Sequence, residues 1–474
     1  MKLTREQIEE VLSCDVAVAP KERGVMVDGI AWDSREVEPG CAFLAVAGEK
    51  VDGNDYIPDA IDAGAVLVIA TREPTDEEMA LACRADAVIV VVGDHLQAMD
   101  ELASCYRSQL DATVIGVTGS SGKTTTKDMI ATILGEEFRT TATLSNQNNE
   151  LGVPGTVLSA APDCEMLVVE MGMRGLGQIE GLCRTVRPTI GIITNIGTAH
   201  EELLGSRENI ARAKSELISA LPDGEGVAVL NGDDPFTPMV MDFARVGERG
   251  IHTILYGMGD GCTVRASEVG YSALGCPSFK VTFPNGRQGR VTLPLMGEHN
   301  VMNALGAAAV AFACDMPIER ICNALRLVKP QHMRQEVVEA GGVRIVNDAY
   351  NANPDSMRAA LSLFEVMEAG GRKVAVLGDM GELGSDEARL HEEVGAACAE
   401  AGVDLLVTIG ELARHIAAGA RLAGMPASAI IECSDVDAAV SALEPELAPG
   451  DVVLVKASRF MGLEKVVEGL VERC

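Results

Sequence analysis

Aromatic and basic residues are scarce in this 474-residue sequence. Phe, Trp and Tyr make up 3% of it, with a single Trp, and 39 Lys and Arg stand against 70 Asp and Glu, for a formal net charge of −31. This acidity disfavours nucleic acid and anionic membrane surfaces as partners. Anionic small molecules stay possible, because charges are screened over about 8 Å at physiological salt and a few local cations can hold a phosphate.

Paired cysteines and long apolar segments are also missing. The 13 Cys are dispersed without any C-x-x-C pair, which indicates reduced thiols in the cytosol rather than a disulfide framework or a zinc site. The first residues, MKLTREQIEEVLS, predict a charged amphipathic helix rather than a signal peptide. Apolar runs stay well short of the roughly 18 residues that span a bilayer. We therefore expect a soluble, cytoplasmic protein without membrane insertion.

The residues that are present predict an α/β protein of three domains. At roughly 150 residues per domain, the length accommodates three separate cores. A repeated pattern of strand, glycine loop and helix begins at Ala112, and a second such series begins after about Pro330. We therefore expect an N-terminal domain over residues 1–110, a central domain over 111–329 and a C-terminal domain over 330–474, the last two built on mostly parallel sheets.

Nearly continuous apolar runs mark the expected strands, as is typical where both faces of a parallel sheet are covered. These runs are Ala42–Val46, Val66–Ala70, Ala87–Val92, Thr113–Val117, Met166–Glu170, Ile190–Thr194, Val227–Leu230, Arg344–Val346, Lys373–Leu377, Leu405–Ile409 and Val452–Lys456. A hairpin is predicted over Phe279–Leu295, around the turn residues Asn285 and Gly286. Ser385–Ala401 is the clearest helix.

The strongest motif runs from Gly116 to Thr125, GVTGSSGKTT, where an apolar strand enters a glycine turn and then a helix. This context suits a phosphate-binding loop, because small residues let backbone N–H groups and the helix N-terminus face phosphate oxygens. Lys123 adds a full positive charge, and Thr124 offers a hydroxyl to Mg²⁺. An ordinary strand–helix turn is the alternative, but it does not explain the lysine. The residues expected to bind ATP here are Gly119, Ser120, Ser121, Gly122, Lys123, Thr124 and Thr125.

Two polar residues follow later strands of the same domain. Glu170 closes the run MLVVE, and His200 follows the segment ITNIGTA. Because the carboxyl ends of parallel strands lie together, both side chains could converge on the nucleotide phosphates. Taken alone, Glu170 could be a solvated loop residue and His200 a structural histidine.

Six motifs resemble, in this order, those of the ATP-dependent Mur ligases of peptidoglycan synthesis: TGSSGKTTTKDM, NQNNELGVP, VVEMGMRGLGQIEGL, NIGTAHEELLGSRENIARAKSEL, GEHNVMNALGAA and NDAYNANPDSM. The resemblance covers essentially the whole chain. It implies a UDP-binding N-terminal α/β domain, a central P-loop ATPase domain and a Rossmann-like C-terminal domain, with the active site formed where the domains meet.

Within this family, Asn146–Asn149 and Leu377–Gly384 resemble the member that joins D-alanyl-D-alanine to UDP-N-acetylmuramoyl-tripeptide. The resemblance thus implies an ATP-dependent ligase, acting as a monomer, that forms an amide through an acyl phosphate. The alternative is the member that adds the third peptide residue, lysine or diaminopimelate, although its D-N-P-R motif is absent. The alternative from another functional class is a nucleotide-dependent switch protein. ATPase activity that does not depend on any acceptor substrate would favour it.

The resemblance also implies roles for individual residues near the phosphates. Lys214, in ARAKSEL, matches a lysine that reacts with CO₂ and becomes a carboxylate-like ligand of a second Mg²⁺. His200 would bind that ion, with Glu170 nearby, while Lys123 and Thr124 serve the phosphates and the first ion. From the residues alone, an exposed helix lysine beside Arg212 and Glu216 is the favoured interpretation of Lys214; the resemblance favours the carbamate.

The remaining implied roles concern contacts to ATP, to the sugar nucleotide and to the dipeptide. Asn300 and Asn303 lie at helical spacing in a stretch that resembles an adenine site. Arg334 would reach the γ-phosphate, and Asp348 and Asn351 the ribose and phosphates. The other residues implied are Ser34 and Arg35 for the uridine diphosphate, Asn148 and Asn149 for the muramoyl-peptide, and Ser458 and Arg459 for the dipeptide.

Overall fold

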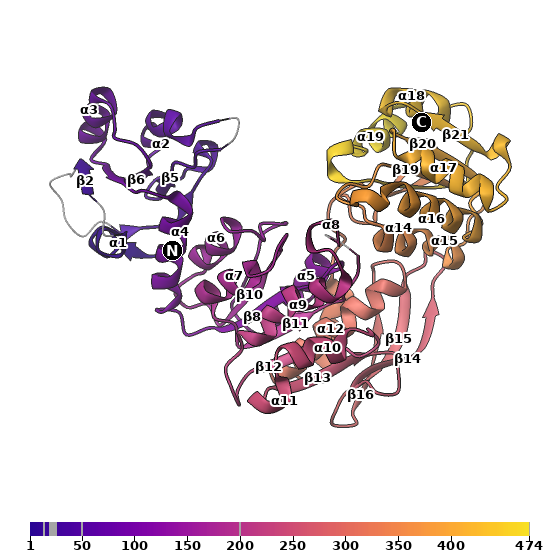
Figure 1. Ribbon diagram of the computed structural model, residues 1–474, viewed down its shortest axis with the longest axis horizontal. Coiled ribbons are helices and arrows are strands. Elements are labelled where there is room, and N and C mark those ends of the chain that lie inside the picture. The colour runs from indigo at the N-terminus through magenta and orange to yellow at the C-terminus, as the bar shows by residue number, and fades with distance from the viewer. Residues whose placement is uncertain (13–14, 19–25, 49–50, 199–200, 474) are drawn as a thin grey trace.

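Three large β-sheets, one in each successive part of the chain, organise the computed structural model (Figure 1), and a two-stranded sheet lies beside the first of them in sequence. The structure describes residues 1–12, 15–18, 26–48, 51–198 and 201–473. In Figure 1 the central unit lies at the bottom, and the N-terminal and C-terminal units rise from opposite sides of it. The predicted boundaries at 110 and 329 fall in the connections that precede β8 and β17.

The N-terminal unit has a sheet of order β2-β7-β6-β5-β4, parallel except for the edge strand β2. Its strands are β1 (Leu3–Thr4), β2 (Asp15–Val18), β3 (Met26–Val27), β4 (Ile30–Ala31), β5 (Ala42–Leu44), β6 (Leu67–Ala70) and β7 (Val88–Val91), and its helices are α1 (Arg5–Leu12), α2 (Ile57–Asp62), α3 (Asp76–Ala85) and α4 (His95–Arg107). Helix α4 packs on helices of the central unit, so one continuous apolar core joins the two units.

The central unit has a nine-stranded sheet of order β16-β15-β14-β13-β12-β11-β8-β10-β9. Its strands are β8 (Thr113–Thr118), β9 (Thr140–Ala142), β10 (Met166–Glu170), β11 (Ile190–Ile193), β12 (Val227–Asn231), β13 (His252–Gly257), β14 (Val264–Tyr271), β15 (Pro277–Thr282) and β16 (Gln288–Thr292). Strand β8 is first in the sequence but lies between β10 and β11, so the strand order reverses beside it. Ligands of open α/β sheets bind at the carboxyl ends of strands at such a point.

Helices cover both faces of this sheet. They are α5 (Lys123–Gly135), α6 (Gly152–Ser159), α7 (Gln178–Val186), α8 (Glu201–Leu204), α9 (Arg207–Ser219), α10 (Thr237–Phe243), α11 (Val246–Arg249), α12 (Glu298–Ala313) and α13 (Ile318–Ala324). Helices α5 and α12 share one core, and α6, α7 and α9 lie in the other. One glycine and many alanines let α12 pack closely, since a Cβ at Gly306 would lie 2.9 Å from Ile192.

The C-terminal unit has a sheet of order β17-β18-β22-β19-β20-β21, parallel except for the edge strand β17. Its strands are β17 (Glu336–Ala340), β18 (Val343–Asn347), β19 (Lys373–Gly378), β20 (Leu405–Ile409), β21 (Ile430–Cys433) and β22 (Val452–Lys456), and its helices are α14 (Pro354–Leu361), α15 (Leu363–Val366), α16 (Glu387–Glu400), α17 (Ala413–Leu422), α18 (Val436–Leu443) and α19 (Glu464–Arg473).

The apolar runs predicted the parallel strands, and the structure confirms them with shifts at their ends. The predicted hairpin is present as β15 and β16, and β14 joins it to form an antiparallel extension of the central sheet. The strands β1 to β4, β9, β13, β14, β17 and β21 were missed; in β13, for example, HTILYG mixes polar and aromatic residues. In the described parts of the chain, every helix is too short or too polar to cross a membrane.

Candidate active site

The turn between β8 and α5 can be made only with glycine at two positions. Gly122 has a φ of +75°, in the left-handed region, and a Cβ there would lie 2.4 Å from the Oδ1 atom of Asn303. Gly119 also has a positive φ, and a Cβ there would lie 1.7 Å from the Oγ1 atom of Thr194. The loop therefore presses against β11 and α12, with its backbone amides at the start of a helix, where phosphate oxygens bind.

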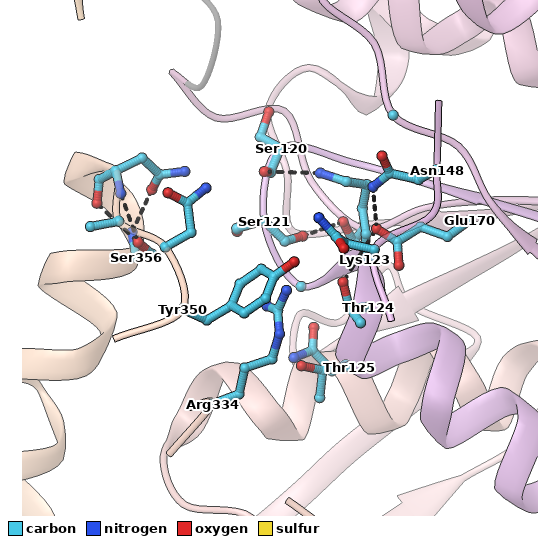
Figure 2. Close-up of a pocket in the computed structure, with 18 of the residues that line it drawn as sticks. Ser120, Ser121, Lys123, Thr124, Thr125, Asn148, Glu170, Arg334, Tyr350 and Ser356 are labelled. Atoms are coloured by element: carbon cyan, nitrogen blue, oxygen red, sulfur yellow. Dashed lines mark hydrogen bonds between the residues drawn. The ribbon is translucent and has the colours of Figure 1, made fainter. Parts of the chain in front are cut away.

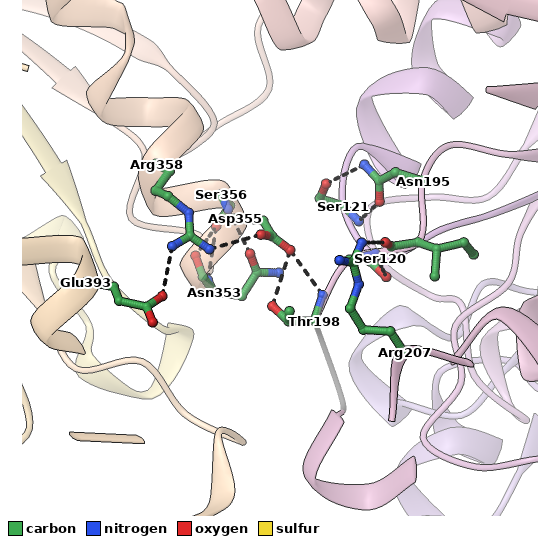
Figure 3. A network of polar contacts seen from close by, with 12 residues as sticks. Ser120, Ser121, Asn195, Thr198, Arg207, Asn353, Asp355, Ser356, Arg358 and Glu393 are labelled. Carbon is green, nitrogen blue, oxygen red and sulfur yellow. Dashed lines mark hydrogen bonds and ion pairs between the residues drawn. The ribbon is translucent and has the colours of Figure 1, made fainter. Parts of the chain in front are cut away.

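Side chains at the end of β11 hold this loop in shape (Figure 3). The backbone N–H groups of Ser120 and Ser121 donate to the carbonyl and side-chain oxygens of Asn195, both at 3.0 Å. The Thr194 hydroxyl donates to the Ser121 carbonyl at 2.6 Å. The sequence analysis missed Asn195, which directly follows the predicted strand Ile190–Thr194.

Two cations from different units face the phosphate loop (Figure 2). The Lys123 ammonium donates to the Gly119 carbonyl at 2.8 Å. Arg334, from the C-terminal unit, lies over the ring of Tyr350 at 4.0 Å from its centroid. Burial lowers the pKa of Lys123; the charge of Glu170 raises it, and that of Arg334 lowers it further. A bound polyanion would stabilise both cations.

Glu170, at the end of β10, has one carboxylate oxygen held by neighbours and one without a partner. Its Oε1 atom accepts hydrogen bonds from the Thr124 hydroxyl at 3.2 Å and the Asn148 amide at 2.7 Å. Its buried Oε2 atom has no hydrogen-bond partner among the described residues. A carboxylate beside a hydroxyl is a donor set that suits Mg²⁺. His200, the other predicted ligand, lies outside the described residues.

Lys214 is buried in the interior of α9, with 2% of its side-chain surface exposed. The alternative of an exposed helix lysine is therefore wrong. Lys214 lines the same cavity as the phosphate loop and has no hydrogen bond or ion pair with any residue that the structure describes. Burial lowers its pKa well below the ordinary value, and the charge of Lys123 lowers it further. Its amine is thus easily neutral, the form that reacts with CO₂.

Side-chain amides from α12 meet the linker to the C-terminal unit. The Asn300 amide donates to the Gln335 Oε1 atom at 3.0 Å, and the Asn303 amide donates to the Asn300 Oδ1 atom at 3.0 Å. Gln335 also contacts the His299 Nε2 atom at 2.9 Å. Burial lowers the pKa of His299 to about 4, so its ring is neutral. These side-chain amides line the cavity. The sequence analysis did not predict Gln335.

Residues that follow or end β18 and β22 place a further cation, Lys456, beside the carboxylate of Asp348. Lys456 pairs with Asp348 at 2.6 Å and donates to the Asn351 carbonyl at 2.9 Å. The Ser458 hydroxyl accepts from the Gly381 N–H at 2.9 Å. Arg459, about half exposed, pairs with Glu464 at 2.8 Å. Lys456 was expected only as the end of a strand.

The predicted uridine residues lie outside this cavity, whose volume is about 1210 Å³. Ser34 and Arg35 form a short 3₁₀ turn in which Arg35, 87% exposed, pairs with Asp33 at 2.5 Å. The Asn149 side chain accepts from the N–H of Gly152, the first residue of α6, at 3.0 Å, and Asn148 donates to Glu170. The structure therefore brings together the predicted phosphate-loop residues, Glu170, Lys214 and the predicted C-terminal residues, and leaves the uridine residues apart.

The only Trp of the chain packs where the N-terminal and central units meet. A Cβ at Gly155, in α6, would lie 2.7 Å from the Trp32 ring. We expect the fluorescence of Trp32 to change when UDP-N-acetylmuramoyl-tripeptide is titrated in, because the predicted uridine residues follow it directly in the sequence. Because there is one Trp, the signal reports this position alone. Unchanged emission at saturating ligand would contradict the placement.

A buried histidine holds the loop Leu377–Gly384, which lines the cavity. The His391 Nε2 atom accepts from the Met380 N–H at 2.9 Å, and its Nδ1 atom lies 2.7 Å from the Glu387 carbonyl oxygen. His391→Gln keeps an acceptor near Nε2, whereas His391→Asn leaves the Met380 N–H unpaired. We expect His391→Asn to lose about 1–3 kcal/mol of unfolding free energy and His391→Gln less, measured by urea unfolding. Equal losses would refute this role.

Three family models match the chain. The Mur ligase family, catalytic domain, matches residues 26–107, the Mur ligase middle domain matches 117–311, and the Mur ligase, glutamate ligase domain, matches 333–459. Together they span the three structural units in order.

Relatives and solved structures match over nearly the full length. The UDP-N-acetylmuramoyl-tripeptide–D-alanyl-D-alanine ligases of Bacillus subtilis (strain 168) and Escherichia coli (strain K12) are 36% and 32% identical, each covering 100% of this chain and 99% of the relative. MurF from Acinetobacter baumannii superposes with a TM-score of 0.86 at 31% identity, covering 100% of this chain and 99% of that one. MurF ligase from Thermotoga maritima in complex with ADP gives 0.79 at 29% identity, covering 94% and 98%.

Proposed function

Because the chain belongs to the Mur ligase family, we propose that it joins D-alanyl-D-alanine to UDP-N-acetylmuramoyl-tripeptide as ATP is cleaved to ADP and phosphate. The observation that carries the proposal is the junction cavity, where Lys123 of the phosphate loop and Arg334 of the C-terminal unit face the same space. Relatives named for this reaction over their full length support the dipeptide as the acceptor.

In the first step, an oxygen of the tripeptide's terminal carboxylate attacks the γ-phosphorus of ATP. The bond from the γ-phosphorus to the bridging oxygen breaks, which gives ADP and an acyl phosphate. Phosphoryl transfer depends mainly on positioning and charge neutralisation. The backbone amides at the start of α5, from Gly122 to Thr125, would hold the phosphates, and Lys123 and Arg334 would neutralise the transferring oxygens.

In the second step, the free amine of D-alanyl-D-alanine attacks the carbonyl carbon of the acyl phosphate. The carbon–oxygen bond to phosphate breaks, phosphate leaves with the electron pair, and the amine nitrogen loses a proton as the amide forms. We place the dipeptide near Ser458 and Arg459, beside the loop Leu377–Gly384, because these residues line the cavity on the C-terminal side.

The orphaned Glu170 oxygen and the Thr124 hydroxyl fit a magnesium ion. Mg²⁺ bound there supplies positive charge to the phosphoryl oxygens. We propose that Lys214 is carbamylated and, with His200, holds a second Mg²⁺. Neutral Lys214 gains an N–C bond to CO₂ and loses a proton, and the positive charge of Lys123 stabilises the resulting anion.

The other substrate contacts are proposed from the sequence motifs. Adenine is assigned to Asn300 and Asn303, the ribose and phosphates to Asp348 and Asn351, the uridine diphosphate to Ser34 and Arg35, and the muramoyl-peptide to Asn148 and Asn149. We also propose that the chain acts as a monomer in the cytoplasm, where its energy source ATP is available.

The proposal is tested by phosphate release from ATP with UDP-N-acetylmuramoyl-tripeptide, with and without D-alanyl-D-alanine. We expect release to require both substrates and the product to be heavier by one dipeptide in mass analysis. Release with UDP-N-acetylmuramoyl-dipeptide and a single amino acid would instead assign the chain to the third-residue step. Release without any acceptor would favour a nucleotide switch.

A further inference from the structure

Two consecutive backbone amides after β11 are bound by two different units (Figure 3). The Gly197 N–H donates at 2.8 Å to the hydroxyl of Ser120, in the phosphate loop. The next N–H, of Thr198, donates at 3.0 Å to the Oδ2 atom of Asp355, in the C-terminal unit. The Thr198 hydroxyl donates to the same oxygen at 3.2 Å. One short segment thus links the phosphate loop to the C-terminal unit.

Asp355 is held in position for this contact at the start of α14. Asn353 and Ser356 form a capping box around it, and Arg358 donates to its other oxygen at 3.3 Å. A Cβ at Gly197 would lie 2.4 Å from the Asp355 Oδ2 atom, so the approach requires glycine at that position. The contact between Asp355 and Thr198 therefore depends on residues of both the central and the C-terminal unit.

Asp355 acts at a distance from the substrates. Its neighbours Asn353 and Ser356 line the junction cavity, whereas Asp355 is outside the described lining and faces Thr198. The segment that also braces Ser120 therefore connects Asp355 to the phosphate loop. The hydrogen bonds from Gly197 to Ser120 and from Thr198 to Asp355 order the same short segment. Each bond favours the other, because the entropic cost of ordering the segment arises only once.

We propose that Asp355 is a positioning residue that couples docking of the C-terminal unit to ATP binding. With Asp355 bound to Thr198, Gly197 is held against Ser120 and the phosphate loop has its binding shape. By linkage, ATP strengthens docking as much as docking strengthens ATP binding. The docked C-terminal unit also carries Arg334, so the same coupling brings that cation to the nucleotide. The inference rests on the proposed ATP site.

The test compares Asp355→Ala with the wild type by calorimetric titration of a non-hydrolysable ATP analogue with Mg²⁺. We expect the variant to bind about 10-fold more weakly, within the 5- to 150-fold range of typical couplings. Thr198→Val, which keeps the backbone N–H and loses the hydroxyl, should fall between the two. The matched control is Glu393→Gln, which loosens the outer pair with Arg358 at 3.2 Å and leaves the Thr198 contacts intact. It should bind like the wild type.

A double-mutant cycle separates coupling from simple loss of structure. In a Ser120→Ala background, Asp355→Ala should weaken binding clearly less than it does alone. Equal losses in both backgrounds, or unchanged affinity of a folded Asp355→Ala, would overturn this inference and leave the proposed function standing. A wild-type protein that does not bind the ATP analogue would overturn both. Should Asp355→Ala fail to fold, Asp355→Asn, which loses the charge and keeps the volume, takes its place in the cycle.

Discussion

Lys123→Met is expected to lower kcat for amide formation about 10³-fold, the order lost when a cation that stabilises a transferring phosphoryl group is removed. The Lys123 ammonium, 2.8 Å from the Gly119 carbonyl, is the cation built into the phosphate loop itself. The substituted side chain keeps the length and the packing of lysine but cannot neutralise the charge that develops on the γ-phosphoryl oxygens. Phosphate release in the presence of all three substrates measures the effect.

Two further variants show whether the effect belongs to this position. Lys465→Met removes an exposed lysine from α19, and we expect unchanged kcat. Lys123→Arg keeps the charge with a bulkier, planar head that the loop cannot seat, so we expect it to remain strongly impaired. The fluorescence response of Trp32 to the UDP substrate should persist in Lys123→Met. A kcat within tenfold of the wild type would show that Lys123 is not essential for phosphoryl transfer.

The phosphate loop and the strand ends could be predicted because their signals are local. A lysine between a glycine turn and an apolar helix has few structural explanations, and the apolar runs gave the strand whose end carries Glu170. Helical spacing also predicted that Asn300 and Asn303 share a helix face, and the structure confirms it, since their side chains meet; their role toward adenine was implied only by the resemblance and stays a prediction. In each of these cases, the atoms that meet are close in the sequence or lie at equivalent strand ends.

Other parts of the site depend on the register between paired strands and on contacts between units, and neither can be read from a local sequence pattern. Lys456 reaches Asp348 because β18 and β22 pair in parallel with Asn347 opposite Val455, and that register cannot be read from either strand alone. Asp355 and Gln335 meet the central unit only across the domain boundary. Lys214 has charged sequence neighbours that suggest exposure, whereas the fold turns its side chain inward.

Lys214→Arg is expected to lower kcat about 10²- to 10³-fold, the order lost when a group that stabilises developing charge is removed. Arginine cannot form a carbamate, and it places a positive charge where the carbamate would be negative, so an uncharged variant is needed beside it to separate the two effects. In the wild type, we expect a carbamate signal in ¹³C NMR after incubation with ¹³C-bicarbonate. We also expect activity to fall in CO₂-depleted buffer and to return when bicarbonate is added.

The burial of the Lys214 amine explains why we expect a carbamate in the wild type and a lower kcat when it cannot form. A group with 2% exposure and a lowered pKa avoids positive charge, and a carbamate there is an anion that Lys123 and a bound Mg²⁺ would stabilise. The modification thus replaces like-charge repulsion at this site by attraction. Lys214→Met serves as the matched apolar variant and should be impaired equally, without a bicarbonate response. A wild type that lacks the carbamate signal and is indifferent to CO₂ would show that the neutral amine itself is the working form.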